Sequence, residues 1–296
     1  MSSKLVLPFR SLLFISKRCF RISSVCILIV CTYILPFDAI SQGNLLVTPR
    51  RVVFEGKKKS IDLNLANTGQ DTATYAISMV QIRMNEDGSF GETITEPDPG
   101  QNFADKNIRY FPRSVTLPPN EAQVVKVQLS KANELEPGEY RSHFYFRSIP
   151  KVVALGEEEA EVDTTSISVR LVPVFGITIP AIIRIGQSNT KVTISDLTLE
   201  IKEDSTPTLS LNFNREGNFS VYGDLTVDYV ASNGTVTRVG MANGIAVYTP
   251  NLVRHFQFDL NKLPGVDYNS GKLLVDFSAS SDVEPEKFAE AELRLD

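Results

Sequence analysis

The residue types that most often carry chemistry are sparse in this chain. It contains two histidines, His143 and His255, and each falls inside a stretch of alternating apolar residues. Neither is accompanied by a second histidine, a cysteine or an acidic cluster at the spacing of metal ligands. No glycine-rich phosphate loop leads from a strand into a helix, and no serine occupies a nucleophile elbow. The sequence therefore predicts no catalytic residue, no metal and no cofactor, and we expect a protein that is not an enzyme.

The first 41 residues differ from the rest of the chain. Five basic residues precede an apolar run from Ile22 to Ile40, which ends with Ala39-Ile40-Ser41. A basic start, an apolar middle and small residues at the end are typical of a secretory signal. We expect residues 1–41 to be a signal peptide that is cleaved before Gln42, with an uncleaved membrane anchor as the alternative.

The composition indicates in which cellular compartment the protein acts and which kinds of partner it can bind. All three cysteines lie in the signal, at Cys19, Cys26 and Cys31, so the mature chain is held by packing alone, which favours the periplasm. The signal carries five basic residues against Asp38, a net charge of +4, so the formal charge of −5 for the whole chain becomes −9 after cleavage. A chain with this negative charge and with scattered basic residues is not expected to bind nucleic acid. We expect no membrane span after cleavage.

Short apolar runs that alternate with polar residues and end at turn residues follow Asn44, which is typical of strands. Seven strands are expected in a first domain, at residues 45–54, 60–65, 74–84, 111–117, 122–129, 140–146 and 165–179. Eight are expected in a second domain, at residues 192–201, 208–213, 219–230, 235–239, 245–248, 255–260, 273–277 and 291–295. Asn233-Gly234 marks a tight hairpin turn in the second domain. The sequence predicts an all-β protein with two immunoglobulin-like β-sandwich domains at an angle, covering residues 42–186 and 187–296.

Between the last two strands of the first domain, residues 156–163 carry five acidic residues without an apolar period. Such a run indicates an exposed, solvated loop. Steering of a partner by charge is the alternative.

Three stretches of the first domain are more specific than a generic sandwich. Glu136-Pro137-Gly138-Glu139-Tyr140 has the spacing of a tyrosine corner, and a run of aromatic residues continues from Tyr140 to Ile149-Pro150. The first strand contains Arg51-Val52-Val53-Phe54-Glu55-Gly56, and the middle contains the Pro-rich passage from Phe111 to Glu121. Together these motifs resemble the PapD-like periplasmic chaperones of pili and fimbriae, over residues 44 to 186.

The resemblance implies a chaperone that lends its last first-domain strand to an incomplete subunit. Strand addition obtains affinity from main-chain hydrogen bonds and specificity from alternate side chains. The lending strand would be Thr165 to Phe175, in which Ile167, Val169 and Leu171 form one apolar row. An ordinary strand with this row on its own core is the alternative.

The resemblance also implies that an arginine and a lysine hold the terminal carboxylate of the subunit. The motif places Arg51 in the arginine role, and an arginine can grip a carboxylate with two parallel hydrogen bonds. A surface charge beside Arg50 is the alternative role for Arg51. The lysine is missing, since Thr178 or Pro180 stands near its expected position. Either Arg51 acts with Thr178 and backbone donors, or Arg184 reaches in, or this chain does not bind a terminal carboxylate.

The combined expectation is a periplasmic chaperone that binds and caps pilus or fimbrial subunits by donating a β-strand. Its partners would be those subunits and an outer-membrane usher. The alternative is a non-catalytic envelope scaffold or adhesive protein that uses the same fold without handing on clients.

Overall fold

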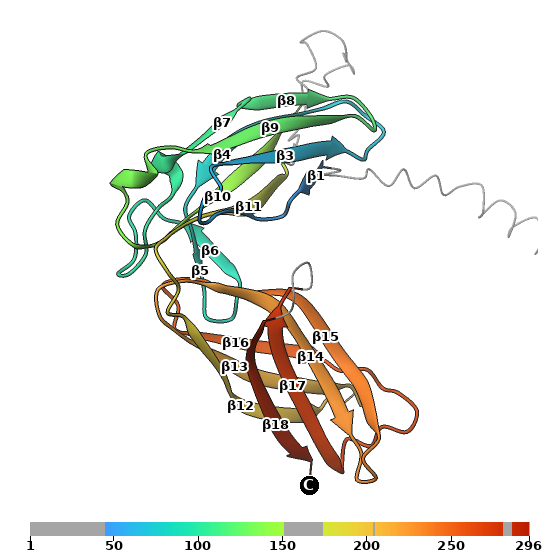
Figure 1. Ribbon diagram of the computed structural model, residues 1–296. Helices are drawn as coiled ribbons and strands as arrows, with labels where there is room; N and C mark the ends of the chain where they lie inside the picture. Colours follow the sequence, from blue (N-terminus) through green and yellow to red (C-terminus); the bar gives the residue numbers. More distant parts are fainter. Residues whose placement is uncertain (1–44, 151–173, 204, 281–285, 296) are drawn as a thin grey trace, which may run out of the picture. The chain divides into compact units, whose positions relative to one another are not determined.

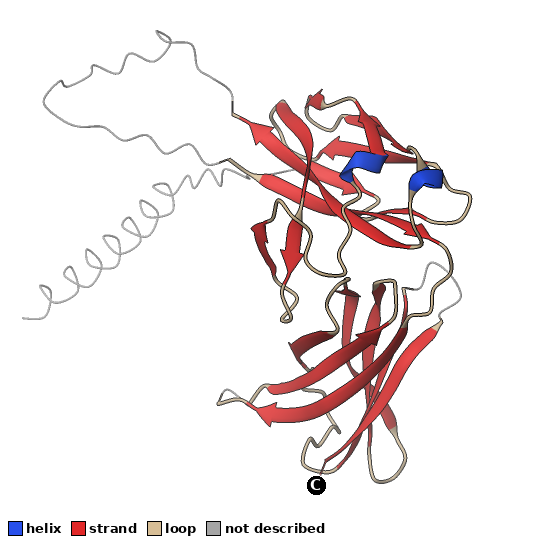
Figure 2. Ribbon diagram, turned by 90° about the vertical axis from the view of Figure 1, so that its left-hand side faces the viewer, coloured by secondary structure: helices blue, strands red, loops and turns tan. Residues whose placement is uncertain are grey.

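The computed structural model describes residues 45–150, 174–203, 205–280 and 286–295, and strands make up most of them (Figure 1). The helical elements of these residues are two short 3-10 turns, η1 at Asp105–Asn107 and η2 at Ala132–Glu134, which are blue in Figure 2. No helix in this part of the chain has the length and apolar character to span a membrane. The predicted all-β class with two sandwiches is confirmed.

The first sandwich is built from β1 to β4 and β7 to β11. One sheet has the strand order β1-β3-β9-β7, and the facing sheet has the order β2-β11-β10-β4-β8. The strands are β1 Leu45–Thr48, β2 Val52–Phe54, β3 Ser60–Asn67, β4 Ala73–Val80, β7 Ile108–Phe111, β8 Ser114–Leu117, β9 Ala122–Leu129, β10 Gly138–Ile149 and β11 Gly176–Ile185. Alternate residues of both sheets meet in one apolar core, in which Phe54, Phe144 and Phe146 are almost fully buried.

The single strand predicted at residues 45–54 is two strands in different sheets. β1 pairs antiparallel with β3, whereas β2 pairs parallel with β11, and the cis peptide bond Thr48–Pro49 lies between them. Because proline has no N–H to donate, the ladder ends there and the chain crosses from one sheet to the other. The crossing places Arg51 immediately before β2.

The strand predicted at residues 74–84 is also interrupted. β4 ends at Val80, and residues Ile82–Met84 form β5, which pairs with β6 at Phe90–Thr93 as a separate hairpin. Backbone groups of the hairpin bond to the second sandwich, since the Nδ2 of Asn251 donates to the oxygen of Met84 at 2.9 Å. Sequence alternation alone does not distinguish one long strand from two strands that belong to different sheets.

The second sandwich is built from β12 to β18, in two sheets with the orders β12-β13-β16 and β15-β14-β17-β18. The strands are β12 Lys191–Ile201, β13 Pro207–Glu216, β14 Val221–Val230, β15 Val236–Val247, β16 Val253–Asp259, β17 Gly271–Ala279 and β18 Lys287–Leu295. Its own core contains the buried side chains of Phe213, Leu225 and Phe277. The two strands predicted at residues 235–239 and 245–248 are one strand, β15, which pairs with β14 through two irregularities of register.

Two local predictions are confirmed. The hydroxyl of Tyr140 donates to the carbonyl oxygen of Glu136 at 3.2 Å, which is the backward bond of a tyrosine corner. Between β14 and β15, Gly234 has a φ of 86° and its N–H donates to Ala231 at 2.8 Å, as expected for the Asn233-Gly234 turn. Such a positive φ costs glycine little, because it has no Cβ.

Residues 151–173 lie outside the described residues. The acidic run at 156–163 and the apolar row of Ile167, Val169 and Leu171 fall in this segment. Their predictions stay predictions.

Candidate binding site at the junction of the two sandwiches

Strand β10 presents two different faces. The side chains of Phe144 and Phe146 enter the first core. Glu139, Arg141 and His143 alternate with the core residues, and all three are buried although they are polar. Because side chains of a strand alternate between faces, these three leave the sheet on the side away from its core, where they meet the second sandwich.

The carboxylate of Glu139 connects the two sandwiches. Its Oε2 accepts hydrogen bonds from the N–H of Ser220 at 3.0 Å, the hydroxyl of Ser220 at 2.8 Å and the Nε of Arg184 at 3.1 Å. Its Oε1 accepts from the hydroxyl of Thr249 at 3.2 Å. The side chain is 0% exposed, so it depends on these four donors in place of water.

Arg184 is occupied by this network. Besides Glu139, its guanidinium donates to the carbonyl oxygen of Ser220 at 2.7 Å and to Glu55 at 3.4 Å. If Arg184 bound another carboxylate, it would leave Glu139 as a buried charge without its partner, which is strongly destabilising. We therefore leave Arg184 out of the proposed anchor.

Arg51 is in the opposite situation. It lies half-buried with its Cζ 3.8 Å from the centroid of the Tyr222 ring. Its Nε and Nη2 are buried and make no hydrogen bond. Burial is the main cause that lowers the pKa of Arg51, because the charged form loses water. The guanidinium lies against the ring, and two of its nitrogens have no hydrogen-bond acceptor.

Arg141 and His143 extend this basic surface. Arg141 is 2% exposed and makes three contacts to neutral acceptors, each long: Ile82 oxygen at 3.4 Å, His143 Nε2 at 3.5 Å and Thr249 oxygen at 3.3 Å. Its Nε and the Nδ1 of His143 are buried without a partner. Burial, followed by the charge of Arg141, lowers the pKa of His143 to about 3. The imidazole is therefore neutral, and its Nε2 accepts from Arg141.

Tyrosine rings from the second sandwich cover these cations. Arg141 lies with its Cζ 4.6 Å from the centroid of the Tyr248 ring. Tyr248 belongs to a small apolar cluster with Ile182, and Tyr222 packs against the same cluster. Guanidinium groups are attracted to the faces of such rings. We refer to Arg51, Glu139, Arg141, His143, Tyr222 and Tyr248 as the junction site.

Beside the junction site, β11 has an open edge. β10 pairs with β11 along the whole of Gly176–Ile185, whereas β2 pairs with it only at Ala181, Ile182 and Ile183. In the part of the chain that the structure describes, residues 176–180 of β11 have no strand on this second side. Arg51 directly precedes Val52, the partner of Ala181, so it lies where the open edge ends. Thr178 is exposed on the open stretch, opposite Tyr145.

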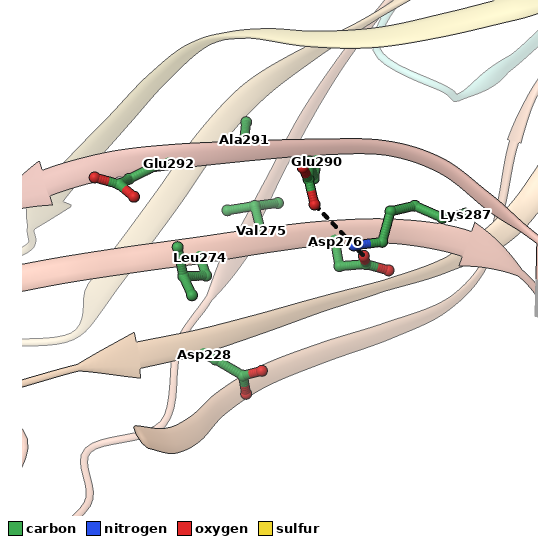
Figure 3. Close-up of a pocket in the computed structure, with 8 residues that line it drawn as sticks. All are labelled: Asp228, Leu274, Val275, Asp276, Lys287, Glu290, Ala291 and Glu292. Atoms are coloured by element: carbon green, nitrogen blue, oxygen red, sulfur yellow. Dashed lines mark hydrogen bonds and ion pairs between the residues drawn. The ribbon is translucent and has the colours of Figure 1, made fainter. Parts of the chain in front are cut away.

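In one surface depression outside the junction site, the charged side chains form ion pairs. Figure 3 shows this depression of about 510 Å³ on the β14-β17-β18 face. Its Lys287 lies 2.9 Å from Asp276 and 2.7 Å from Glu290, and its other carboxylates pair with Arg238 and Lys272. No group of three histidine, cysteine or acidic side chains that could hold a metal occurs among the described residues.

The sequence motif singled out Arg51, whose role as an anchor stays a prediction, but it did not show which residues surround Arg51. The burial of Glu139 and His143 had no signal in the sequence, because alternation of polar and aromatic residues predicts a strand with one solvated face. Arg141 belongs to the same pattern. Tyr222 and Tyr248 had no signal either, because only the packing of the second sandwich on the first brings them to these residues.

Comparison with known proteins gives a limited result. No family model matches the chain, and no curated protein matches it. Among solved structures, it is similar to the YadV chaperone, with 14% identity, a TM-score of 0.42, and coverage of 86% of this chain and 100% of that one. It is also similar to the CupB2 chaperone of Pseudomonas aeruginosa, with 12% identity, a TM-score of 0.39, and coverage of 85% and 100%.

A third similar structure is the CsuC–CsuE chaperone and tip adhesion subunit complex from Acinetobacter baumannii. It shows 13% identity, a TM-score of 0.40, and coverage of 83% of this chain and 99% of that one. All three of these structures are described as chaperones or as a chaperone–subunit complex. The similarity is distant, and the function proposed below is argued from the residues of this chain.

Proposed function

We propose that this protein is a periplasmic chaperone that binds and caps pilus or fimbrial subunits through the edge of β11. The observation that carries the proposal is the open edge at residues 176–180, which ends at the unpartnered guanidinium of Arg51. A client strand added there obtains main-chain hydrogen bonds, and its terminus reaches a cation.

The geometry also favours a direction for the client strand. β2 runs parallel to β11 and occupies its edge from Ala181 onward. A client strand that pairs with residues 176–180 in line with β2 also runs parallel to β11. Its C-terminal end then lies next to Arg51, so its terminal carboxylate meets the guanidinium. Two parallel N–H···O bonds from a guanidinium to a carboxylate then fix the register of the added strand.

The lending strand, with Ile167, Val169 and Leu171, directly precedes β11 in sequence. In the proposal it continues the edge of β11 and inserts its apolar row into the client. Export by a signal cleaved before Gln42, a division into domains at residues 42–186 and 187–296, and delivery to an outer-membrane usher belong to the same proposal. It involves no catalytic step.

The test is capture of clients by the Arg51→Ala variant. Tagged wild-type and variant proteins are expressed at equal level, and the subunits that co-purify from the periplasm are quantified. Arg50→Ala is the matched control, because Arg50 is adjacent and exposed. We expect R51A to lose at least about tenfold in capture, as for loss of a charge-assisted hydrogen bond, while R50A keeps it.

Equal capture by R51A and wild type, with unchanged circular dichroism, would refute the carboxylate anchor. The co-purifying proteins also separate the chaperone from a scaffold or adhesive protein. Subunits that aggregate when this protein is absent support the chaperone, whereas partners that are stable and folded without it support the scaffold.

A further inference from the structure

We propose that Arg141 is the second cation of the carboxylate anchor, in place of the missing lysine. This inference rests on the proposed function and specifies how the anchor is built. It places the second cation on β10 and not on β11, where Pro180 stands opposite His143.

The first argument is charge balance. Among the guanidinium groups at the junction, Arg184 is paired with Glu139, and Arg215 donates to backbone oxygens at 2.8 Å to 3.0 Å. Among the described residues, neither the half-buried Arg51 nor the buried Arg141 forms an ion pair with a carboxylate. A buried cation without a counter-ion is costly, so an entering anion gains more here than at the surface.

The second argument is position. β2 and β10 flank β11, and Arg51 is level with Pro180 while Arg141 is opposite Ile182, so their Cα atoms are about 12 Å apart. Side chains alternate between the two faces of a strand, and Val52, one residue from Arg51, and Phe144, three residues from Arg141, both lie in the core. Arg51 and Arg141 therefore both point away from the core, on the same face of the sheet. Both guanidinium groups end against tyrosine rings of one cluster, Arg51 at Tyr222 and Arg141 at Tyr248. In the proposal, a carboxylate that enters at this tyrosine cluster is held by both arginine side chains.

The third argument is the weakness of the present contacts of Arg141. Hydrogen bonds from N–H groups are usually close to 2.9 Å, whereas the three made by the Arg141 side chain are between 3.3 Å and 3.5 Å. Its Nε has no partner at all. A carboxylate that enters beside the half-exposed Arg51 offers Arg141 shorter, charge-assisted bonds in exchange.

The test uses acetate as the simplest carboxylate probe. The guanidinium Nε–Hε resonances of Arg51 and Arg141 are assigned by NMR in the mature chain and followed during an acetate titration at constant ionic strength with chloride. We expect both resonances to move with one common midpoint. Acetamide, which has the same size and no charge, is the matched control and should move neither.

The outcomes separate this inference from the proposed function. Movement of Arg51 alone would refute the role of Arg141 and leave the anchor at Arg51 intact. Movement of neither resonance would refute both. Arg141→Gln supplies a second measurement on a side chain of similar reach without charge, and we expect about a tenfold weaker acetate affinity by the Arg51 resonance. An unchanged affinity in a folded R141Q protein would also count against the inference.

Discussion

His143 shows how one buried residue is shaped by its neighbours. Its ring is 1% exposed, beside Arg141, and stacks edge-on with Phe90 at a centroid distance of 5.3 Å. Loss of water and the adjacent positive charge both disfavour a protonated imidazole, so the pKa falls to about 3. His143 therefore links folding stability to pH.

The direction of that link follows from proton uptake. In the unfolded chain the pKa of a histidine is about 6.5, so between this value and about 3 the unfolded state binds a proton that the folded state does not. The contribution of His143 to stability is present above pH 6.5 and is lost as pH falls toward 3. We expect a slope of up to about 1.4 kcal/mol per pH unit within this window.

The measurement is urea unfolding between pH 7.5 and 4.5 for wild type, His143→Gln and His255→Gln. The H143Q protein should lack this component of the slope. The H255Q protein should keep it, because the side chain of His255 is 56% exposed. Identical slopes for wild type and H143Q would contradict the burial of a neutral imidazole.

At the scale of elements, the β5–β6 hairpin connects the first sandwich to the second. The N–H of His255 donates to the oxygen of Glu86 at 2.7 Å. Gly88, in the turn of the hairpin, has a φ of 83°, and a Cβ there would overlap the guanidinium of Arg254. The close approach of Arg254 thus depends on a residue without a side chain.

We expect Gly88→Ala to destabilise the protein more than Gly265→Ala. Gly265 has a φ of 82° and nothing within 4 Å of the position of a Cβ, so it reports backbone strain alone, about 1–2 kcal/mol. G88A adds the displacement of the Arg254 guanidinium, which is the end of a flexible side chain, so we expect an additional loss of up to about 1 kcal/mol. The comparison is made by urea unfolding, and equal losses for the two variants would mean that the hairpin does not pack on Arg254.

At the scale of the whole molecule, Glu139 joins two sandwiches that have separate cores. Its donors Ser220 and Thr249 belong to the second sandwich, while Arg184 comes from the end of β11. Removal of the charge leaves Arg184 without its buried counter-ion. We expect Glu139→Gln to lower the free energy of unfolding by about 3 kcal/mol.

The matched control is Glu55→Gln, because Glu55 contacts the same Arg184 but is 55% exposed. Exposed pairs contribute little, so we expect a loss below about 1 kcal/mol. Urea unfolding followed by hydrogen exchange gives the readout, and amides of Ser220 and Thr249 should lose protection in E139Q. Comparable losses in E139Q and E55Q would show that the buried network does not hold the sandwiches together.

The local predictions that succeeded depend on short stretches of sequence. The hydroxyl of Tyr140 reaches Glu136 within one turn of chain, and Asn233-Gly234 adopts its turn because of its own backbone freedom. The strand interruptions at Pro49 and after Val80 were missed, since a strand that changes sheets keeps its alternation of apolar residues.

By itself, the sequence determined the all-β class, the two sandwiches, the tyrosine corner and the arginine at the start of β2. These follow from periodicity, turn chemistry and local motifs, which depend on neighbours in the chain. Only the tertiary structure decided that Arg184 is occupied by Glu139 while Arg51 and Arg141 are unpaired. The availability of a charge depends on the groups that surround it, and here those groups come from β10, from β14 and from the segment after β15, far apart in sequence.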